Sequence, residues 1–172
     1  MTTTQRILVM GVSGSGKSHV GRLLAERIGA RFIDGDDHHS PASIDKMARG
    51  IPLTDADREG WLETLAGFLA EHRAREAPLV VGCSALKRRY RDTLRRGDPG
   101  LAILFLDGTR AQLRERLSSR EGHFFKGDAM LDSQLADLEP PGDDEAITLD
   151  ISQSPGALVA AFLRRHGAGS AT

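Results

Sequence analysis

The stretch GVSGSGKS, residues 11–18, has the residue types and spacing of a site that binds phosphate groups. It matches the pattern G-x-x-x-x-G-K-[ST], in which glycines let successive backbone N–H groups point at one anion. Lys17 can reach the β- and γ-phosphates of a nucleoside triphosphate, and the Ser18 hydroxyl can bind Mg²⁺. A dinucleotide fingerprint is disfavoured because His19 stands where its third glycine would be. We expect the nucleotide to be bound by Gly11, Val12, Ser13, Gly14, Ser15, Gly16, Lys17 and Ser18.

Acidic residues come next, in the stretch FIDGDDHH. A kinase for a small molecule needs one carboxylate that holds Mg²⁺ through water and another that takes the proton of the acceptor hydroxyl. In an extended segment Asp34 and Asp36 share a face, and Asp37 points away. We predict Asp36 as the catalytic base and Asp34 as a metal-binding residue; the alternative is a solvated acidic turn. His38 and His39 are adjacent and therefore diverge, which favours a hydrogen bond to substrate over a transition-metal site.

Basic residues follow two later apolar runs of the chain. In GCSALKRRYR, Ser84 and Lys87 are placed to face a cleft, and the arginines after Lys87 are expected to form a solvated helix face. Cys83 is expected to be a small buried residue, because no partner histidine for a nucleophile is evident. Arg116 and Arg120 lie one helical turn apart, and Arg120 enters a glycine-containing loop. We predict that both close over the triphosphate, with Lys17 and Arg120 as catalytic cations; surface arginines are the alternative.

Elements must position these residues, and apolar runs alternate with helical patterns along the chain. Residues 121–129 are predicted as a loop and 167–172 as a disordered tail. The alternation predicts an α/β fold, with a mostly parallel sheet covered by helices on both faces. Ligands of such sheets bind at the carboxyl ends of the strands. The predicted strands are 7–10, 31–34, 79–83, 101–106 and 147–151, and the predicted helices are 17–28, 44–49, 55–77, 86–96, 110–120, 131–138 and 155–165.

The composition fits one globular domain over residues 1–172, with 40% hydrophobic and 27% charged residues. The net charge of −1 offers no basic excess for nucleic acid or an anionic membrane surface. No run approaches the ~20 apolar residues of a membrane span, and the polar N-terminus does not have the pattern of a signal peptide. A single cysteine excludes an intrachain disulfide and fits a reducing compartment. We therefore expect a soluble cytoplasmic protein that binds neither nucleic acid nor membrane.

Taken together, these residues resemble those of the gluconokinases of the P-loop kinase type, relatives of shikimate and adenylate kinases. The resemblance runs from Ile7 to about Ser152, over the stretches MGVSGSGKS, DGDDHHSPASIDKMARGIPLTDADR followed by WL, CSALKRRYRDTLR, and REGHFFKGDAMLDSQLADLEPP. A shikimate kinase would have a glycine triplet in place of Cys83-Ser84-Ala85. The resemblance implies a P-loop kinase fold with a five-stranded parallel sheet, a mobile lid at about 121–133 and a homodimer. It also implies that ATP, with Mg²⁺, phosphorylates D-gluconate to 6-phospho-D-gluconate.

The resemblance also implies roles for single residues. Gluconate carries a carboxylate that needs a cation, for which Arg58 and Lys87 are the candidates. The chain departs from the family pattern at His38 and Ser40, which bear on the rim of the pocket, and in a stretch after His123 that is about one residue longer. The residues implied to bind substrate are Asp36, His39, Arg58, Ser84, Lys87, His123 and Gln134.

Two other functions remain open from the residues. One is a kinase for another small polyol acid or for shikimate, and the other is a nucleotide-binding switch without catalysis. The D-x-x-G switch pattern is matched at Asp57 to Gly60, but no strand precedes it and no N-K-x-D signature appears. Cations around a second pocket, Arg58 and Lys87 among them, favour an enzyme over a switch.

Overall fold

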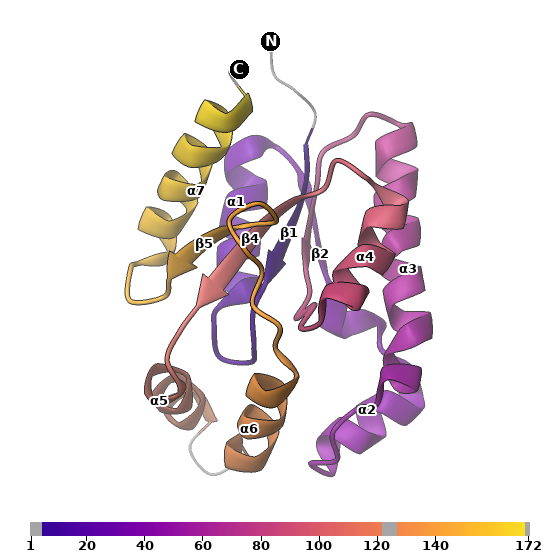
Figure 1. The fold of residues 1–172 in the computed structure, drawn as a ribbon, viewed down its shortest axis with the longest axis vertical. Coiled ribbons are helices and arrows are strands. Elements are labelled where there is room, and N and C mark those ends of the chain that lie inside the picture. Colours follow the sequence, from indigo (N-terminus) through magenta and orange to yellow (C-terminus); the bar gives the residue numbers. More distant parts are fainter. Residues whose placement is uncertain (1–4, 122–126, 171–172) are drawn as a thin grey trace.

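The structure is a computed structural model that describes residues 5–121 and 127–170, with the backbone alone at 119–121, 127 and 168–170. Its sheet has five parallel strands in the order β2-β3-β1-β4-β5 (Figure 1). The predicted α/β fold with a five-stranded parallel sheet is therefore confirmed. The strands are β1 (Arg6–Met10), β2 (Arg31–Asp34), β3 (Leu79–Gly82), β4 (Ala102–Asp107) and β5 (Ile147–Asp150).

The central strands are apolar along nearly their whole length because both faces of the sheet are covered. β1 lies between β3 and β4, so that Leu8 pairs with Val81 on one side and with Ile103 on the other. Every residue of β3 is buried. Strands that are buried on both faces read as continuous hydrophobic runs, which explains why RILVM, LVVG and AILFLD lack the alternation of a half-exposed strand.

Two layers of helices cover the sheet (Figure 1). α1 and α7 pack together on one face, and α3 and α4 pack together on the other. α2, α5 and α6 lie beyond the carboxyl ends of the strands. The helices are α1 (Lys17–Ile28), α2 (Pro41–Ala48), α3 (Asp55–Ala74), α4 (Arg88–Gly97), α5 (Arg110–Glu121), α6 (Gly127–Asp137) and α7 (Pro155–Ser170), and a 3₁₀ helix, η1, spans Gly35–His38.

Several element ends differ from the prediction. α2 begins at Pro41 rather than at residue 44, because the Ser40 hydroxyl caps the helix and proline suits its first turn. α6 begins at Gly127, inside the segment predicted as a loop. α7 continues to Ser170, so residues 167–170 are helical rather than the start of a disordered tail. Extending a formed helix adds a hydrogen bond for each residue, which favours such continuation.

α3 begins with a capping box that accounts for the D-x-x-G match. The Thr54 hydroxyl accepts a hydrogen bond from the Asp57 N–H (3.1 Å), and the Asp57 carboxylate accepts one from the Thr54 N–H (2.8 Å). Lys46 of α2 also donates to Asp57 (2.8 Å). The hydrogen bonds from Lys46 and Thr54 lower the pKa of Asp57 to about 2. Asp57 and Gly60 thus belong to a helix start that joins α2 to α3.

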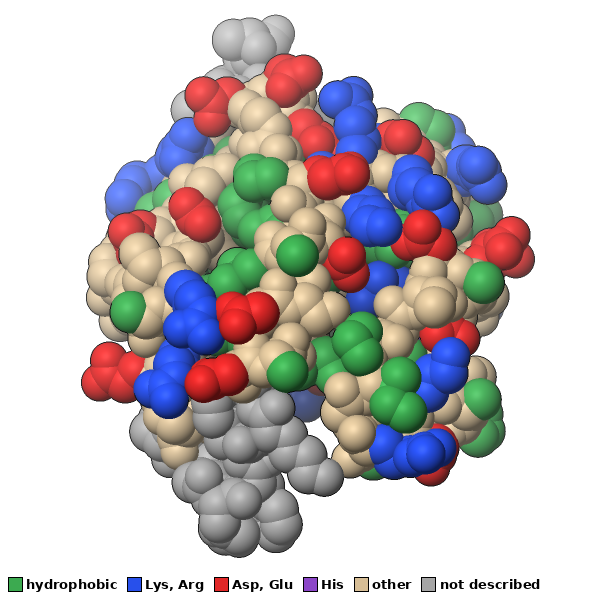
Figure 2. All heavy atoms as spheres, turned by 60° about the horizontal axis from the view of Figure 1, so that its bottom comes forward, with side chains coloured by type: hydrophobic (Ala, Val, Ile, Leu, Met, Phe, Trp, Pro, Cys, Tyr) green, Lys and Arg blue, Asp and Glu red, His purple; other side chains and the backbone are tan. Residues whose placement is uncertain are grey.

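The carboxyl ends of the strands gather the loops that carry the candidate residues. Figure 2 turns this end of the molecule forward and shows acidic and basic side chains interspersed over it. Of the helices formed by the described residues, none has the length and apolar character that crossing a membrane requires.

Candidate active site

The loop between β1 and α1 has the backbone of a phosphate cradle. Gly14 and Gly16 have φ values of 88° and 94°, which side-chain-bearing residues rarely adopt. A Cβ at Gly14 would also lie 2.9 Å from Cγ of Leu117. α1 begins at Lys17, so the positive end of the helix faces the loop. The hydroxyl of Ser15 is buried and has no hydrogen-bond partner among the described residues, as expected of a loop shaped around a ligand.

The acidic stretch meets this loop through Ser18. The Ser18 hydroxyl donates to Oδ2 of Asp34 (2.8 Å). Oδ1 of Asp34 accepts from the Asp36 N–H (3.0 Å), which coils the chain into η1 instead of the extended segment that we predicted. A hydroxyl and a carboxylate side by side are the hard oxygen donors that Mg²⁺ takes together with water and phosphate oxygens. The donor set of Ser18 and Asp34 therefore fits Mg²⁺.

One cavity of about 220 Å³ unites most of the predicted substrate residues with the phosphate loop. Its polar groups come from five separate segments of the chain. Its apolar wall was not predicted, because single apolar residues of loops and helices carry no periodic signal of a pocket. The lining residues are Ser13, Lys17, Asp36, His39, Met47, Leu53, Arg58, Trp61, Ser84, Leu86, Met130 and Gln134.

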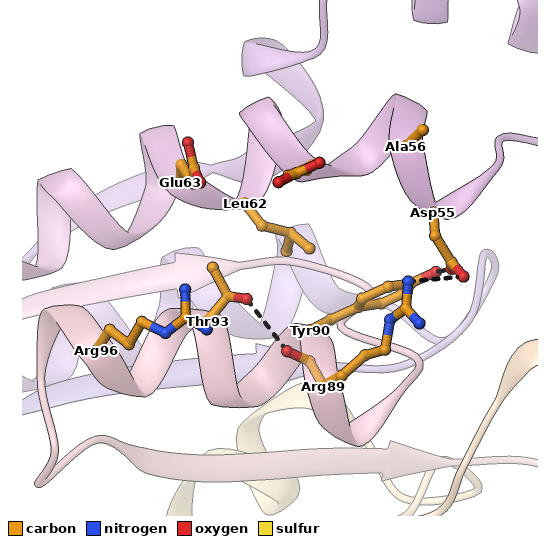
Figure 3. Close-up of a pocket in the computed structure, with 9 residues that line it drawn as sticks. Asp55, Ala56, Leu62, Glu63, Arg89, Tyr90, Thr93 and Arg96 are labelled. Carbon is orange, nitrogen blue, oxygen red and sulfur yellow. Dashed lines mark hydrogen bonds and ion pairs between the residues drawn. The ribbon is translucent and has the colours of Figure 1, made fainter.

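A larger hollow, of about 520 Å³, lies between α3 and α4 (Figure 3). It is lined by residues of these two helices alone, Asp55, Tyr90 and Thr93 among them. No residue of the phosphate loop lines it, so its size does not make it the site of phosphoryl transfer. We take the smaller cavity as the candidate active site.

Asp36 is held in the cavity by an aromatic platform. Nε2 of His39 lies 3.7 Å from Oδ1 of Asp36, and the His39 ring stacks on Trp61 with ring centres 4.0 Å apart. The indole N–H of Trp61 donates to the carbonyl of Gly35 (2.6 Å), which fixes the platform to η1. Contact with His39 and the positive charge of Lys17 lower the pKa of Asp36, whose side chain is 65% exposed. Asp36 is therefore an ionised carboxylate next to the phosphate loop.

His38 and His39 diverge as predicted. The His38 ring packs edge-on against Phe68, with ring centres 4.9 Å apart, on the side of η1 away from the cavity. His39 is buried, and its Nδ1 has no partner among the described residues. A buried nitrogen without a partner in the wall of a cavity is a group that a substrate hydroxyl can satisfy.

α6 connects the two halves of the cavity. The Gln134 side chain accepts from the Ser13 N–H (2.7 Å) and donates to the Ser13 hydroxyl (2.9 Å), so this predicted substrate residue also braces the phosphate loop. One turn further along α6, Asp137 accepts from the buried guanidinium of Arg58 (3.4 Å). Lys17 donates to the carbonyl of Val12 (3.2 Å) within its own loop.

The other predicted residues are placed with different outcomes. Lys87 does not line the cavity, because its ammonium group donates to Asp55 (3.0 Å) at the start of α3. Arg116 lies beside the phosphate loop, where it donates to the Ser15 carbonyl (3.4 Å), and its contact with the triphosphate stays a prediction. The side chain of Arg120 and all of His123 lie outside the described part of the chain.

Comparison with known proteins places the chain in a family. A family model described as an AAA domain matches residues 7–141. The chain is 44% identical to the gluconokinase of Gluconobacter oxydans, over 93% of this chain and 89% of that protein. It is 46% identical to the thermoresistant gluconokinase of Escherichia coli, over 91% of this chain and 90% of that one. The chain belongs to the gluconokinase family.

Solved structures agree with the assignment to the gluconokinases. A gluconokinase from Sinorhizobium meliloti superposes with a TM-score of 0.85 and 46% identity, over 96% of this chain and 94% of that one. An unliganded sugar kinase from Janibacter has a TM-score of 0.87 and 44% identity, over 94% and 93% of the two chains. The shikimate kinase of Aquifex aeolicus, at 17% identity and a TM-score of 0.56, shares the fold.

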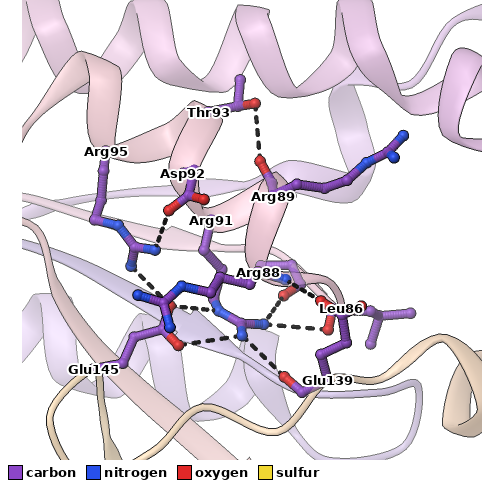
Figure 4. Close-up of polar contacts among 10 residues, drawn as sticks. Leu86, Arg88, Arg89, Arg91, Asp92, Thr93, Arg95, Glu139 and Glu145 are labelled. Atoms are coloured by element: carbon purple, nitrogen blue, oxygen red, sulfur yellow. Dashed lines mark hydrogen bonds and ion pairs between the residues drawn. The ribbon is translucent and has the colours of Figure 1, made fainter.

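In this gluconokinase-family chain, the turn after β3 is strained and is held by hydrogen bonds from a buried arginine. Ala85 has a φ of 46°, a conformation that is costly for a residue with a side chain. Arg91, buried under the turn, donates to the carbonyls of Ala85 (2.8 Å) and Leu86 (3.2 Å) (Figure 4). Its guanidinium also pairs with Glu145 (2.8 Å). The turn presents Ser84 to the cavity, so Arg91 supports the active site from outside it.

Two expectations for this turn had opposite outcomes. Arg91 was predicted to lie on a solvated helix face, which is wrong: its side chain is 1% exposed. The Arg91 side chain points inward from α4 because Glu145 and three backbone carbonyls accept hydrogen bonds from it there. Cys83 is fully buried as predicted, and burial raises the pKa of its thiol to about 12, which keeps it from acting as a nucleophile.

Proposed function

We propose that this protein is an ATP:D-gluconate 6-phosphotransferase, which converts D-gluconate and ATP to 6-phospho-D-gluconate and ADP. The observation that carries the proposal is the single cavity in which the phosphate-loop Lys17, the ionised Asp36 and the buried Arg58 meet. A phosphate cradle, a proton acceptor and a cation for a carboxylate are the three groups that this reaction needs. Membership of the gluconokinase family supports the same substrate.

The transfer is assigned to groups of this chain as follows. The N–H groups of residues 11–18 and the ammonium of Lys17 bind the phosphates and offset the negative charge of the transferred group. Asp36 accepts a hydrogen bond from the 6-hydroxyl and takes its proton as the bond from O6 to the γ-phosphorus forms. The bond from the γ-phosphorus to the bridging oxygen breaks, and ADP leaves with that oxygen. Because Asp36 is a weak base, it first orients the 6-hydroxyl and accepts the proton only late in the phosphoryl transfer.

The far end of gluconate is assigned to Arg58, whose guanidinium can bind a carboxylate in a bidentate manner. His39 and Ser84 are placed to contact the hydroxyls between the two ends. With the carboxylate fixed at one end, the 6-hydroxyl is the group that reaches Asp36. Lys87 reaches the substrate in this proposal only by leaving Asp55, its partner in this structure.

Mg²⁺ is assigned to Ser18 and Asp34, whose oxygens are 2.8 Å apart. When bound, it would neutralise charge on the β- and γ-phosphates. The lid at about 121–133 with Arg120 and His123, the homodimer and the cytoplasmic location stay predictions.

The test is ADP release by the purified protein with Mg²⁺ and ATP, measured with D-gluconate, shikimate, other sugar acids and no acceptor. We expect turnover with D-gluconate far above the others, and ³¹P–¹H coupling in the product should place the phosphate on C6. Lys17→Ala, which removes phosphate charge stabilisation, should abolish turnover and serves as the control for contaminating kinases. Faster turnover with another acid would make that acid the substrate in place of D-gluconate. ATP binding without turnover on any acceptor would favour a nucleotide-binding switch without catalysis.

A further inference from the structure

Arg58 is held by a short chain of hydrogen bonds that leads out of the active site. Its Nη1 donates to the Tyr90 hydroxyl at 3.0 Å, and that hydroxyl donates in turn to Oδ1 of Asp55. Arg58 and Tyr90 are buried, with 8% and 3% of their surfaces exposed. Figure 3 shows Tyr90 reaching from α4 across to Asp55 at the start of α3. These hydrogen bonds therefore connect Arg58, the cation of the cavity, to both α3 and α4.

The direction of each hydrogen bond is fixed by chemistry. A guanidinium can only donate, so the Tyr90 oxygen must accept from Arg58. Asp55 is ionised, since hydrogen bonds from Tyr90 and Lys87 lower the pKa of its carboxyl, and it can only accept. The single phenolic proton must then point at Asp55. Lys87 donates to the same oxygen, Oδ1 (3.0 Å), and Arg89 pairs with Oδ2 (2.8 Å), so that both oxygens of the carboxylate are held in place.

This arrangement uses one nitrogen of Arg58 and leaves an edge of the guanidinium available. Tyr90 and Asp137 both accept from Nη1. Among the described residues, Nε and Nη2 of Arg58 have no hydrogen-bond partner. These two nitrogens form the side-on edge that binds a carboxylate through two parallel N–H donors. A guanidinium that is anchored at Nη1 loses little freedom when a carboxylate docks on that edge.

We propose that Tyr90 and Asp55 are positioning residues that aim Arg58 at the carboxylate of the acceptor. The assignment rests on the proposed function, because it takes a sugar acid as the acceptor. Neither residue touches the substrate; Asp55 orients the phenolic proton, and the phenolic oxygen orients Nη1. The two residues therefore set acceptor affinity and the preference for an acid over a neutral polyol, and leave the phosphoryl transfer to Lys17 and Asp36.

The test is Tyr90→Phe, which removes only the hydroxyl. Thr93→Val is the matched control, because Thr93 lies one turn along α4 in the same hollow (Figure 3). Within the described part of the chain its hydroxyl bonds only to the Arg89 carbonyl of its own helix. We expect Tyr90→Phe to raise KM for D-gluconate about tenfold, the loss typical of a hydrogen bond to a charged group. KM for ATP and kcat should stay within about twofold, and Thr93→Val should match the wild type.

D-gluconamide, which lacks the negative charge, separates positioning from general disruption. Its kcat/KM, or its inhibition constant where turnover is too slow, should be the same in the wild type and in Tyr90→Phe. Asp55→Asn, which keeps the shape but weakens the acceptor, should raise KM for D-gluconate in the same way and guards against a single unstable variant. Equal losses on gluconate and gluconamide, a raised KM for ATP, or an unchanged KM for gluconate would overturn the assignment. A wild-type protein that does not phosphorylate gluconate would instead refute the proposed function.

Discussion

Replacing Arg91 by methionine tests whether a buried cation supports the turn that faces the substrate. Methionine fills most of the volume but carries no charge and no donor. The change removes the ion pair with Glu145 and the hydrogen bonds to the carbonyls of Ala85 (2.8 Å), Leu86 (3.2 Å) and Glu139 (2.9 Å). These carbonyls belong to two segments, residues 85–86 and 139, which Arg91 bridges from α4 (Figure 4). A backbone hydrogen bond from the Glu139 N–H to the Leu86 carbonyl (2.8 Å) joins the same two segments directly.

The expected cost lies at the lower end of the range for a broken buried pair. Removing one partner of such a pair costs about 3–5 kcal/mol of unfolding free energy, because a buried charge is left behind. Arg95 remains 2.9 Å from the Glu145 carboxylate and compensates part of that charge. We therefore expect a loss of about 3 kcal/mol, which for a chain of this size lowers Tm by roughly 6–12 °C. Urea unfolding followed by the fluorescence of Trp61, the single tryptophan, measures it.

The functional part of this prediction follows from the strain at Ala85. Without the donor below it, the turn can relax from a φ of 46°, and Ser84 moves with it. KM for gluconate should rise while KM for ATP, set by the loop after β1, changes little. Arg95→Met is the control, since Arg95 pairs with the same Glu145 but does not contact the turn. A loss of stability below about 1 kcal/mol, or equal effects of the two variants, would refute the reasoning.

Carboxylates of the site and of the α3 cap carry three more predictions. Asp36→Asn should lower kcat by about 10²–10⁴ and leave the Kd for ATP unchanged by calorimetry; a kcat within tenfold of the wild type would exclude Asp36 as the base. Asp34→Asn should raise the Mg²⁺ concentration for half-maximal turnover at least about tenfold, and EDTA should stop the wild type; an unchanged requirement would place the metal elsewhere. Asp57 has its pKa lowered from 3.8 to about 2, so its stabilising effect is complete above 3.8 and is lost as the pH falls towards 2. Asp57→Asn should therefore flatten the loss of stability over that interval in acid titrations of unfolding, and an unaltered slope would show that the cap contributes nothing.

Parts of the fold whose determinants are local could be predicted from the sequence. α1 and β2 begin and end as predicted, at Lys17–Ile28 and Arg31–Asp34, because Gly29 ends the helix and an apolar run follows at once. The phosphate loop was predictable for the same reason, since its glycines are required by its own backbone. No distant residue needs to be known to recognise it.

Other local signals were present but compete with one another. Asp34 was placed on an extended segment, yet its side chain accepts from the Asp36 N–H and bends the chain into η1. Asp34 still meets Ser18, so the predicted metal pair does not depend on the conformation that was assumed for it. The start of α2 was readable from Ser40 and Pro41, a cap followed by proline in the first turn.

The roles of the cations could not be predicted in this way, because the partner anion decides them. Lys87, Arg89 and Arg91 lie within one short stretch, KRRYR, in which every position but one is basic. Arg91 turns inward because Glu145, far along the chain, accepts from it, and Lys87 stays outside the cavity because Asp55 holds it. Helical spacing alone cannot tell a buried arginine from an exposed one, since a guanidinium is buried only where other residues supply hydrogen-bond acceptors for it.

The same reasoning explains why the acceptor half of the site was harder to predict than the nucleotide half. Phosphate is bound mainly by backbone N–H groups, whose placement needs only glycine, lysine and serine in one short loop. In the proposed site the sugar acid is bound by side chains, among them Arg58, which Tyr90 and Asp137 hold from two other elements. On this proposal, acceptor specificity depends on pairs of residues that are distant in sequence, such as Arg58 and Tyr90. The Tyr90→Phe variant is therefore expected to change specificity without altering any group that contacts the substrate.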